Sequence, residues 1–357
     1  RQMCIRDRRK SIAIIITSIL VLSGCNKQQS VSDRLLNEVE KAIAINPDSA
    51  SNLLKSISSP EKLDDKAFAR WCMLSGKITD EIFNSILPTY QLERAYDWYS
   101  SHGSPDEQVQ ILIYLGRSYF ADGDYDKAMS IYTNALDIAE KNKLNNLTGY
   151  TYSYIGDLYG EKFMRTEAIK RYKAAAECFK KENNTDSYAC ALRDVGREYA
   201  CIDSLSRALK ILTIADSVAR NTKNIEVTAS IDNALGNIYA MQNKYDKAEE
   251  YFLKALVGRE TMPDYMALID LYIASGAINK AQELLSKILQ DNPKYTYSIK
   301  YLYYQIYNEE KNYKEALTNL KEYVEITDSI IYADNQSKIL NIESKYNHLK
   351  ISKEVDR

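Results

Sequence analysis

The stretch LGRSYFADGDYDKAMSIYTNALDIAEK, residues 115–141, decides the fold because its spacing recurs three more times along the chain. Its Leu-Gly step, with Ile or Val replacing Leu in two copies, returns every 40 residues, and a tyrosine follows each glycine by three positions. A trio of alanine, a large apolar residue and alanine then follows at a constant distance. The glycines are Gly116, Gly156, Gly196 and Gly236, and the trios begin at Ala128, Ala168, Ala208 and Ala248. This self-similarity predicts stacked helical hairpins, since one hairpin cannot bury its apolar face alone.

Small residues are expected to set the packing inside each hairpin. Gly116 should let the backbones of the paired helices approach closely, and Tyr119 should fill the space one turn later. Ala128 is small where the second helix crosses the first. Turns that contain Gly123 or Asn243 separate the helices, because glycine and asparagine tolerate a left-handed backbone.

The pattern resembles the tetratricopeptide-repeat (TPR) family, whose motif carries Leu-Gly, Tyr, Ala, an aromatic residue and Ala at these offsets. The resemblance implies an all-α, right-handed α-solenoid of TPR helical hairpins, with about six repeats over residues 105–327. Two later copies are degenerate and shorter, with Ile269 and Tyr304 where the glycine belongs, and Leu212 replaces the aromatic residue in the third copy.

Residues 34–104 look like degenerate TPR-like hairpins that cap the array. They resemble the start of a large class of Bacteroidota TPR proteins. Ser59 is expected to cap a helix that begins at Pro60 and carries Phe68 and Trp71, because serine at the cap followed by proline at the first position favours a helix start.

The N-terminus carries an export signal. A basic segment precedes an apolar run over residues 12–22, and Leu-Ser-Gly-Cys closes the run at Cys25. At ~1.5 Å per residue the run is too short to span a hydrocarbon core of ~30 Å. The ending resembles the lipobox of bacterial lipoproteins, and the whole chain resembles TPR lipoproteins of the Bacteroidota. The resemblance implies a signal peptide and lipobox over residues 1–25, lipidation of Cys25, a linker over residues 26–33, and an outer-membrane anchor facing the periplasm. An uncleaved signal anchor is the alternative.

The C-terminal helix expected over residues 328–357 contains no Pro or Gly, and Ile339, Ile342, Tyr346 and Leu349 recur 3 and 4 positions apart, as in a coiled coil. In similar Bacteroidota proteins such a helix leads into a transmembrane segment. One hypothesis is therefore the periplasmic sensory region of a single-span receptor, truncated before its membrane helix. The other is a terminal helix that covers the last hairpin of a protein-binding scaffold. A glycan-binding lipoprotein is a third, disfavoured hypothesis, because the TPR starch-uptake partners that it would resemble carry a large insertion that this array lacks.

Composition argues against several chemistries. A formal net charge of -2 without a basic block offers no face for nucleic acid. Two histidines cannot supply a catalytic triad or a histidine metal site, and there is no glycine-rich phosphate loop. We therefore predict a protein that is not an enzyme and has no cofactor or metal. Cys190 and Cys201 would lie about 16 Å apart along one helix, too far for a disulfide, so with Cys72 and Cys178 they are expected to be buried free thiols.

The predicted binding surface lies on the first helices of the hairpins, which line the concave groove of TPR proteins. Positions i and i+4 of such a helix share a face. Asparagine amides there can bond the backbone of an extended peptide or protein partner, and arginine forks can hold its carboxylates. An ordinary solvated face is the alternative. The predicted groove residues are Arg117, Asp157, Arg193, Arg197, Asn233, Asn237, Tyr301 and Gln305. Chaperone-tail binding is not predicted, because Ala234 occupies a position where chaperone-binding TPRs carry an asparagine.

Overall fold

The computed structural model describes residues 33–82, 86–291 and 296–355. Every regular element within these ranges is helical, which confirms the all-α prediction. In the same ranges, no helix is both long and apolar enough to cross a membrane. The predicted signal peptide and its Cys25 lie outside the described residues.

The chain divides into two compact units, Arg1–Asn142 and Lys143–Arg357, and the division falls inside the predicted repeat array. The helices of the first unit pack in sequence order, α3 on α4 and α5 on α6. Its elements are a helix over residues 33–43, α2 (Pro47–Lys55), the short 3-10 helix η1 (Pro60–Lys62), α3 (Asp65–Ile82), α4 (Thr89–His102), α5 (Pro105–Ala121) and α6 (Tyr125–Lys141).

The predicted helix start at Ser59 is wrong. Pro60–Lys62 forms only a 3-10 turn, the Ser59 side chain makes no capping hydrogen bond, and α3 begins at Asp65. The Ala67 amide donates to the Asp64 carboxylate over 2.9 Å. An aspartate nearer the apolar stripe therefore caps the helix in place of the serine.

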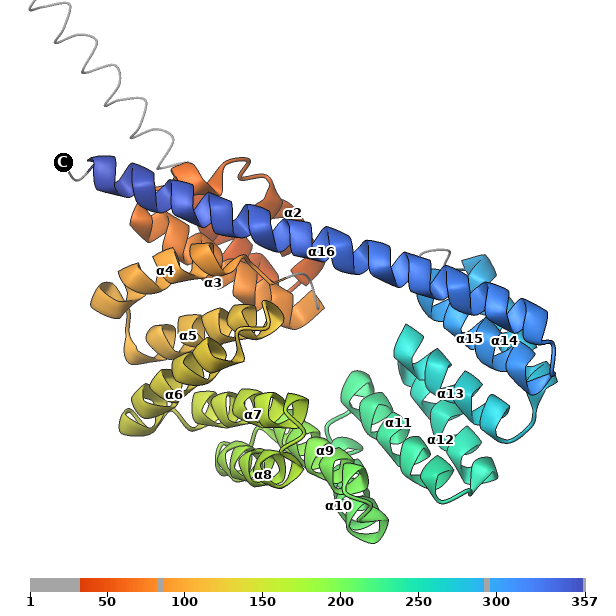
Figure 1. Ribbon diagram of the computed structural model, residues 1–357. Helices are drawn as coiled ribbons and strands as arrows, with labels where there is room; N and C mark the ends of the chain where they lie inside the picture. The colour runs from red at the N-terminus through yellow and green to blue at the C-terminus, as the bar shows by residue number, and fades with distance from the viewer. Residues whose placement is uncertain (1–32, 83–85, 292–295, 356–357) are drawn as a thin grey trace, which may run out of the picture. The chain divides into compact units, whose positions relative to one another are not determined.

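The second unit is a solenoid of hairpins in which each odd-numbered helix pairs with the even-numbered helix that follows it (Figure 1). Its helices are α7 (Asn145–Glu161), α8 (Arg165–Lys181), α9 (Thr185–Cys201), α10 (Leu205–Ala219), α11 (Ile225–Met241), α12 (Tyr245–Gly258), α13 (Met262–Ala274), α14 (Ile278–Asp291), α15 (Thr296–Glu309) and α16 (Tyr313–Val355). Ala175, Ala208 and Ala215 are fully buried in the cores between these helices, as their places in the trios predict.

The repeat glycines make room for a side chain of the second helix. A Cβ atom on Gly156 would lie 2.7 Å from Cε1 of Tyr172, and one on Gly236 would lie 2.6 Å from Cε1 of Phe252. We expected the two backbones to approach one another. Instead the large residue of the trio packs its ring directly against the glycine backbone, which is why glycine and a large residue recur together.

Six successive turns, from the one before α7 to the one before α12, follow a period of 20 residues. A residue that is not glycine follows the preceding helix at each of these turns with φ between 56° and 61°, the left-handed region. After α8, for example, the backbone N–H of Asn184 donates to the Phe179 carbonyl over 2.9 Å. The left-handed residues are Lys143, Phe163, Asn183, Asp203, Lys223 and Asn243.

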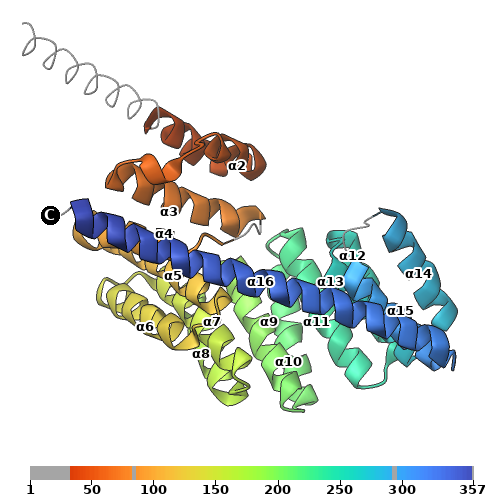
Figure 2. The ribbon, with the colours of Figure 1, turned by 45° about the horizontal axis from the view of Figure 1, so that its top comes forward.

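α16 is one continuous helix of 43 residues, and only its first part packs against α15 (Figure 2). Ala316 is buried in this pairing, and the Lys300 ammonium lies 2.5 Å from a Glu322 carboxylate oxygen. The C-terminal helix expected from residue 328 is thus a continuation of the second helix of the last hairpin.

The four described cysteines are free thiols of differing exposure. Cys72 is buried, and burial raises the pKa of its thiol. Cys178 and Cys190 are half-buried. The expectation of a buried thiol is wrong for Cys201, which is exposed because it is the last residue of α9.

Candidate functional site

Successive first helices of the second unit touch one another, α9 against α11 and α11 against α13 (Figure 1). Together with the connection into α13 they line an open groove of about 470 Å³, which we call the Arg/Asn groove. Its charged and amide groups come from Arg193, Arg197, Asn233, Asn237, Arg259 and Asp264. The structure therefore brings together four of the predicted groove residues.

Arg193 is held in place by its own helix and by the next repeat. Its Nε and Nη2 donate to the two carboxylate oxygens of Asp194 over 2.9 and 3.1 Å, and its Nη1 donates to Ser230 Oγ on α11 over 3.0 Å. Burial acts to lower the pKa of the guanidinium, but the Asp194 carboxylate outweighs this and raises the pKa. Arg193 thus keeps its charge and ties α9 to α11 as well as lining the groove.

Arg197 is the accessible cation of the groove. Its side chain is 66% exposed, and its contact with the Asp194 carboxylate is long, at 3.8 Å. On the neighbouring helix the Asn237 amide donates to the carbonyl and to the side-chain oxygen of Asn233, both over 3.0 Å. These bonds orient the amide at a point where its residue is exposed. Arg197 and Asn237 are therefore the groups best placed to meet a ligand.

Asp264 is the buried centre beneath the groove. It is 1% exposed and accepts from Arg259 Nε and Nη2, each over 3.0 Å. It also accepts from the Asn233 amide over 2.9 Å and from the Thr261 hydroxyl. This carboxylate fixes the α12–α13 connection and thereby the position of Arg259 in the wall.

Asp157 lies one repeat before Arg193. Asp157 does not line the Arg/Asn groove. The residue as a whole is exposed, but burial of its carboxylate raises its pKa to about 6. The Tyr172 hydroxyl donates to Asp157 Oδ1 over 2.6 Å, which favours the ionised form. Asp194 acts to raise the pKa, and Arg193 and Arg197 act to lower it. The negative charge at this place consequently changes near neutral pH.

Two predicted residues on α15 lie outside the lining of the Arg/Asn groove. Tyr301 packs its ring against Tyr304 and Tyr323, with centroids 5.8 and 5.2 Å apart. Gln305 is half-buried on the same helix. Both contribute to the hairpin of α15 and α16.

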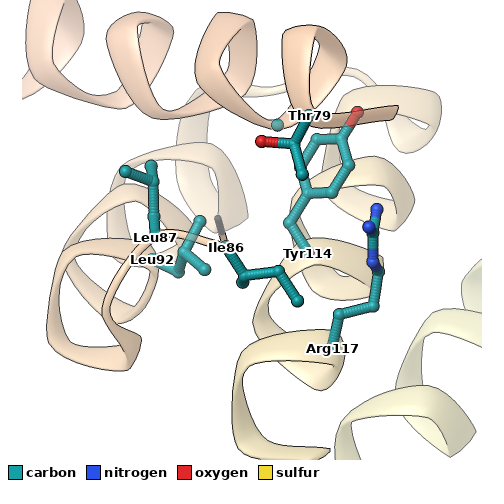
Figure 3. Close-up of a pocket in the computed structure, with 7 residues that line it drawn as sticks. Thr79, Ile86, Leu87, Leu92, Tyr114 and Arg117 are labelled. Carbon is teal, nitrogen blue, oxygen red and sulfur yellow. The ribbon is translucent and has the colours of Figure 1, made fainter. Parts of the chain in front are cut away.

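Arg117 belongs to the first unit. It forms an ion pair with Asp80 and lies 5.9 Å from the ring centroid of Tyr114. Figure 3 shows Arg117 and Tyr114 together with Thr79 and Ile86 around a narrow pocket. The space there is about 10 Å³, which is the room that one water molecule needs. Arg117 thus has a packing role within its own unit.

Sequence reasoning missed Arg259 and Asp264, because neither occupies a repeat-signature position. A signal for Asp264 was present. Thr261 precedes a helix whose first turn carries Pro263 and Asp264, and an acid in a first turn beside a capping threonine is a common arrangement. No comparable pattern pointed to Arg259.

Within the described residues, no group of three or more His, Cys, Asp or Glu side chains is placed to hold a metal ion. The groove is lined by guanidinium and amide groups, the Ser230 hydroxyl, the Cys201 thiol, the buried Asp264 carboxylate and apolar side chains. The guanidinium and amide groups suit noncovalent recognition of an extended chain, since they can hydrogen-bond its backbone and its carboxylates.

Comparison with known families identifies the repeats. One tetratricopeptide-repeat model matches residues 112–145, and a second matches residues 228–262. The chain contains tetratricopeptide repeats. No curated protein matches its sequence.

Solved structures share the tetratricopeptide-repeat fold. A Rap protein complexed with competence and sporulation factor has a TM-score of 0.65 and 18% identity, covering 85% of this chain and 88% of that chain. Aspartyl phosphate phosphatase F from Bacillus subtilis has a TM-score of 0.56 and 15% identity, covering 78% and 75%. A tetratricopeptide-repeat protein from Parabacteroides merdae has a TM-score of 0.51 and 17% identity, covering 72% and 93%. At these identities the likeness concerns the fold.

Proposed function

We propose that this protein is a lipid-anchored scaffold of the cell envelope that holds an extended segment of a partner protein in the Arg/Asn groove. The observation that carries the proposal is the groove itself, about 470 Å³ in volume, with an exposed Arg197 on one helix and an oriented Asn237 on the next. The Asn237 side-chain oxygen accepts a backbone N–H of the segment, and Arg197 binds an acidic side chain or a terminal carboxylate.

A displayed library of random linear peptides tests the groove whatever the identity of the partner. We expect enrichment of peptides that contain Asp or Glu, and a loss of their binding on Arg197→Ala. Arg207→Ala is the matched control, because Arg207 is an exposed arginine on α10 that does not line the groove. Equal peptide binding by the two variants would show that the groove is not the binding site. Arg193 is a poorer choice, because its loss would leave Asp194 without its bidentate partner.

The anchor is proposed from the sequence Leu22-Ser23-Gly24-Cys25, which follows an apolar run. Two or more acyl chains, at ~0.8 kcal/mol per buried CH₂, would keep the protein on a membrane. Metabolic labelling with an alkyne fatty acid should label the chain, and Cys25→Ser should abolish both the label and sedimentation with membranes. Cys201→Ser, which changes the exposed thiol, should leave both unchanged. A label that survives Cys25→Ser would contradict the anchor.

The location follows from the anchor and is proposed with it. The residues after Cys25, Asn26 to Gln29, contain no aspartate and no acidic run. By resemblance this favours the outer membrane and an orientation toward the periplasm. Separation of the two membranes on a density gradient, with protease added to intact cells, tests both points. Recovery with the inner membrane, or digestion in intact cells, would contradict this location.

A further inference from the structure

The outer face of α16 is apolar and exposed. Within the second unit, α15 is the helix that packs against α16. Residues seven apart on a helix differ by only about 20° around the axis, so Leu317, Val324 and Ile331 lie in one stripe. These side chains are 53%, 46% and 52% exposed. Figures 1 and 2 both show α16 running on past α15 as a single helix.

The same face is buried in an earlier hairpin. Ala316 holds the repeat position of Ala168, so Leu317 and Val324 correspond to Ile169 and Ala176 of α8. Ile169 is 7% exposed and Ala176 is 3% exposed, and α8 packs against α9. In α16 both positions are open to solvent, and Val324 is larger than Ala176. An exposed apolar stripe of this kind marks a surface that binds a partner.

Charges on the stripe indicate what covers it. Lys321 and Asp328 are exposed and lie on the same face, three residues before and four residues after Val324. Leu317 and Ile331 lie seven residues on either side of Val324. An antiparallel pair of α16 helices with a two-fold axis at Val324 would therefore set Leu317 against Ile331 of the second copy. It would also bring Lys321 to within one residue, about 1.5 Å along the axis, of the level of Asp328 of the second copy.

A parallel pair does not have this complementarity. It would place Lys321 beside Lys321 of the second copy and Asp328 beside its own equivalent, and like charges in direct opposition destabilise a helix pair. The stripe is thus complementary to a second copy of itself in the antiparallel orientation. This is the property that an isologous two-fold interface needs, because the same patch must serve on both copies.

We propose that α16 docks on α16 of a second copy of this chain, antiparallel about Val324, and joins two solenoids through their C-terminal hairpins. A paired segment over residues 313–335 is roughly 34 Å long and 10 Å wide, so the pair buries on the order of 700 Å² in total. This lies below the ~1,200 Å² of a standard stable interface. The dimer is accordingly reversible and depends on protein concentration.

Cysteine cross-linking of the full chain in mild detergent tests the geometry. Under mild oxidation we expect Val324→Cys to form a disulfide-linked dimer with itself. Leu317→Cys and Ile331→Cys should form one only when the two variants are mixed. The wild type and Ser329→Cys are the controls, since Ser329 is exposed but lies about 140° around the helix from Val324. Self-linking by all three stripe variants would show a parallel pair and overturn the proposal.

Charge reversal tests the interface independently. Light scattering over a concentration series should give a dimer constant that Lys321→Glu weakens about tenfold, because both copies then oppose like charges. Adding Asp328→Lys to that variant should restore the dimer. A monomer at every concentration, or a double variant no stronger than the single one, would overturn the proposal.

Discussion

Phe252 packs its ring against the backbone of Gly236, so closely that a Cβ atom on the glycine would lie 2.6 Å from Cε1 of the ring. Phe252 itself is 1% exposed. The glycine of the first helix and the large residue of the second are therefore two halves of one contact. This contact holds the hairpin of α11 and α12 together.

Gly236→Ala should destabilise the protein, although alanine ordinarily favours a helix over glycine by roughly 0.5–1 kcal/mol. The added methyl group would force Phe252 out of a packed core, which typically costs about 1–3 kcal/mol. Urea unfolding followed by circular dichroism measures the change in the free energy of unfolding.

Gly160→Ala is the matched control, because a Cβ there would meet only the far ends of the Glu198 and Arg165 side chains, the nearest atom being a Glu198 carboxylate oxygen at 3.3 Å. It should be neutral or stabilising. The double variant Gly236→Ala with Phe252→Ala should lose less free energy of unfolding than the two single variants lose when their losses are added, since the residues contact one another. Strict additivity would show that the contact does not set the cost.

Phe163 lies in the turn between α7 and α8 with φ of +57° and is 78% exposed. A left-handed backbone costs a residue with a Cβ about 1–2 kcal/mol, and the exposed ring regains little by burial. Phe163→Gly should therefore raise the free energy of unfolding by about 1 kcal/mol. Asn243→Gly at the equivalent turn should give a smaller gain, because asparagine tolerates this conformation. Equal thermal shifts for the two variants would contradict this account.

The fold could be predicted because its signals are periodic and local. Gly116, Gly156, Gly196 and Gly236 repeat at one interval, and each hairpin is a short-range unit that needs only its neighbours. Helix starts outside the repeat were harder to predict. Ser59-Pro60 and Asp64 both carry start signals, and the outcome depends on where the apolar stripe of α3 meets its core.

Asp157 should reduce stability as the pH rises. Its pKa in the folded protein is about 6, above the ordinary value of 3.8, because partial burial disfavours the charged form. Its stabilising contribution is therefore complete below pH 3.8 and is lost as the pH rises through about 6. The wild type should lose stability relative to Asp157→Asn between pH 4 and 7, by on the order of 0.5 kcal/mol after solvent screening. Thermal unfolding of both proteins across this range measures the difference.

Tyr172→Phe is the companion variant for this titration. The Tyr172 hydroxyl donates to Asp157 over 2.6 Å and favours the ionised carboxylate, so its removal should raise the pKa of Asp157 further. The pH window of the stability change should move upward. The carboxyl carbon signal of Asp157, followed by NMR across the pH range, measures this pKa. An unchanged pKa in Tyr172→Phe would show that the hydrogen bond does not act on this titration.

The candidate site could be predicted only in part, for a geometric reason. Spacing of i and i+4 places Arg193 with Arg197, and Asn233 with Asn237, on single helix faces, and the groove brings these faces together. Which unit a helix joins, and what an arginine pairs with, depends on long-range contacts. Arg117 therefore forms an ion pair with Asp80 in the first unit, a pairing that no local spacing reveals.

Asp264 is the residue beneath the groove whose loss should be most costly. Asp264→Ala would leave the Arg259 guanidinium and the Asn233 amide without their buried acceptor, and losses of this kind cost roughly 2–4 kcal/mol. Asp264→Asn should cost less, because its amide oxygen can still accept one of these bonds. Glu260→Ala, an exposed change in the same connection, should have little effect in urea unfolding. If Asp264→Ala unfolded at the wild-type urea concentration, the α12–α13 connection would be held by its apolar contacts alone. The position of Arg259 in the groove wall would then depend on packing rather than on this carboxylate.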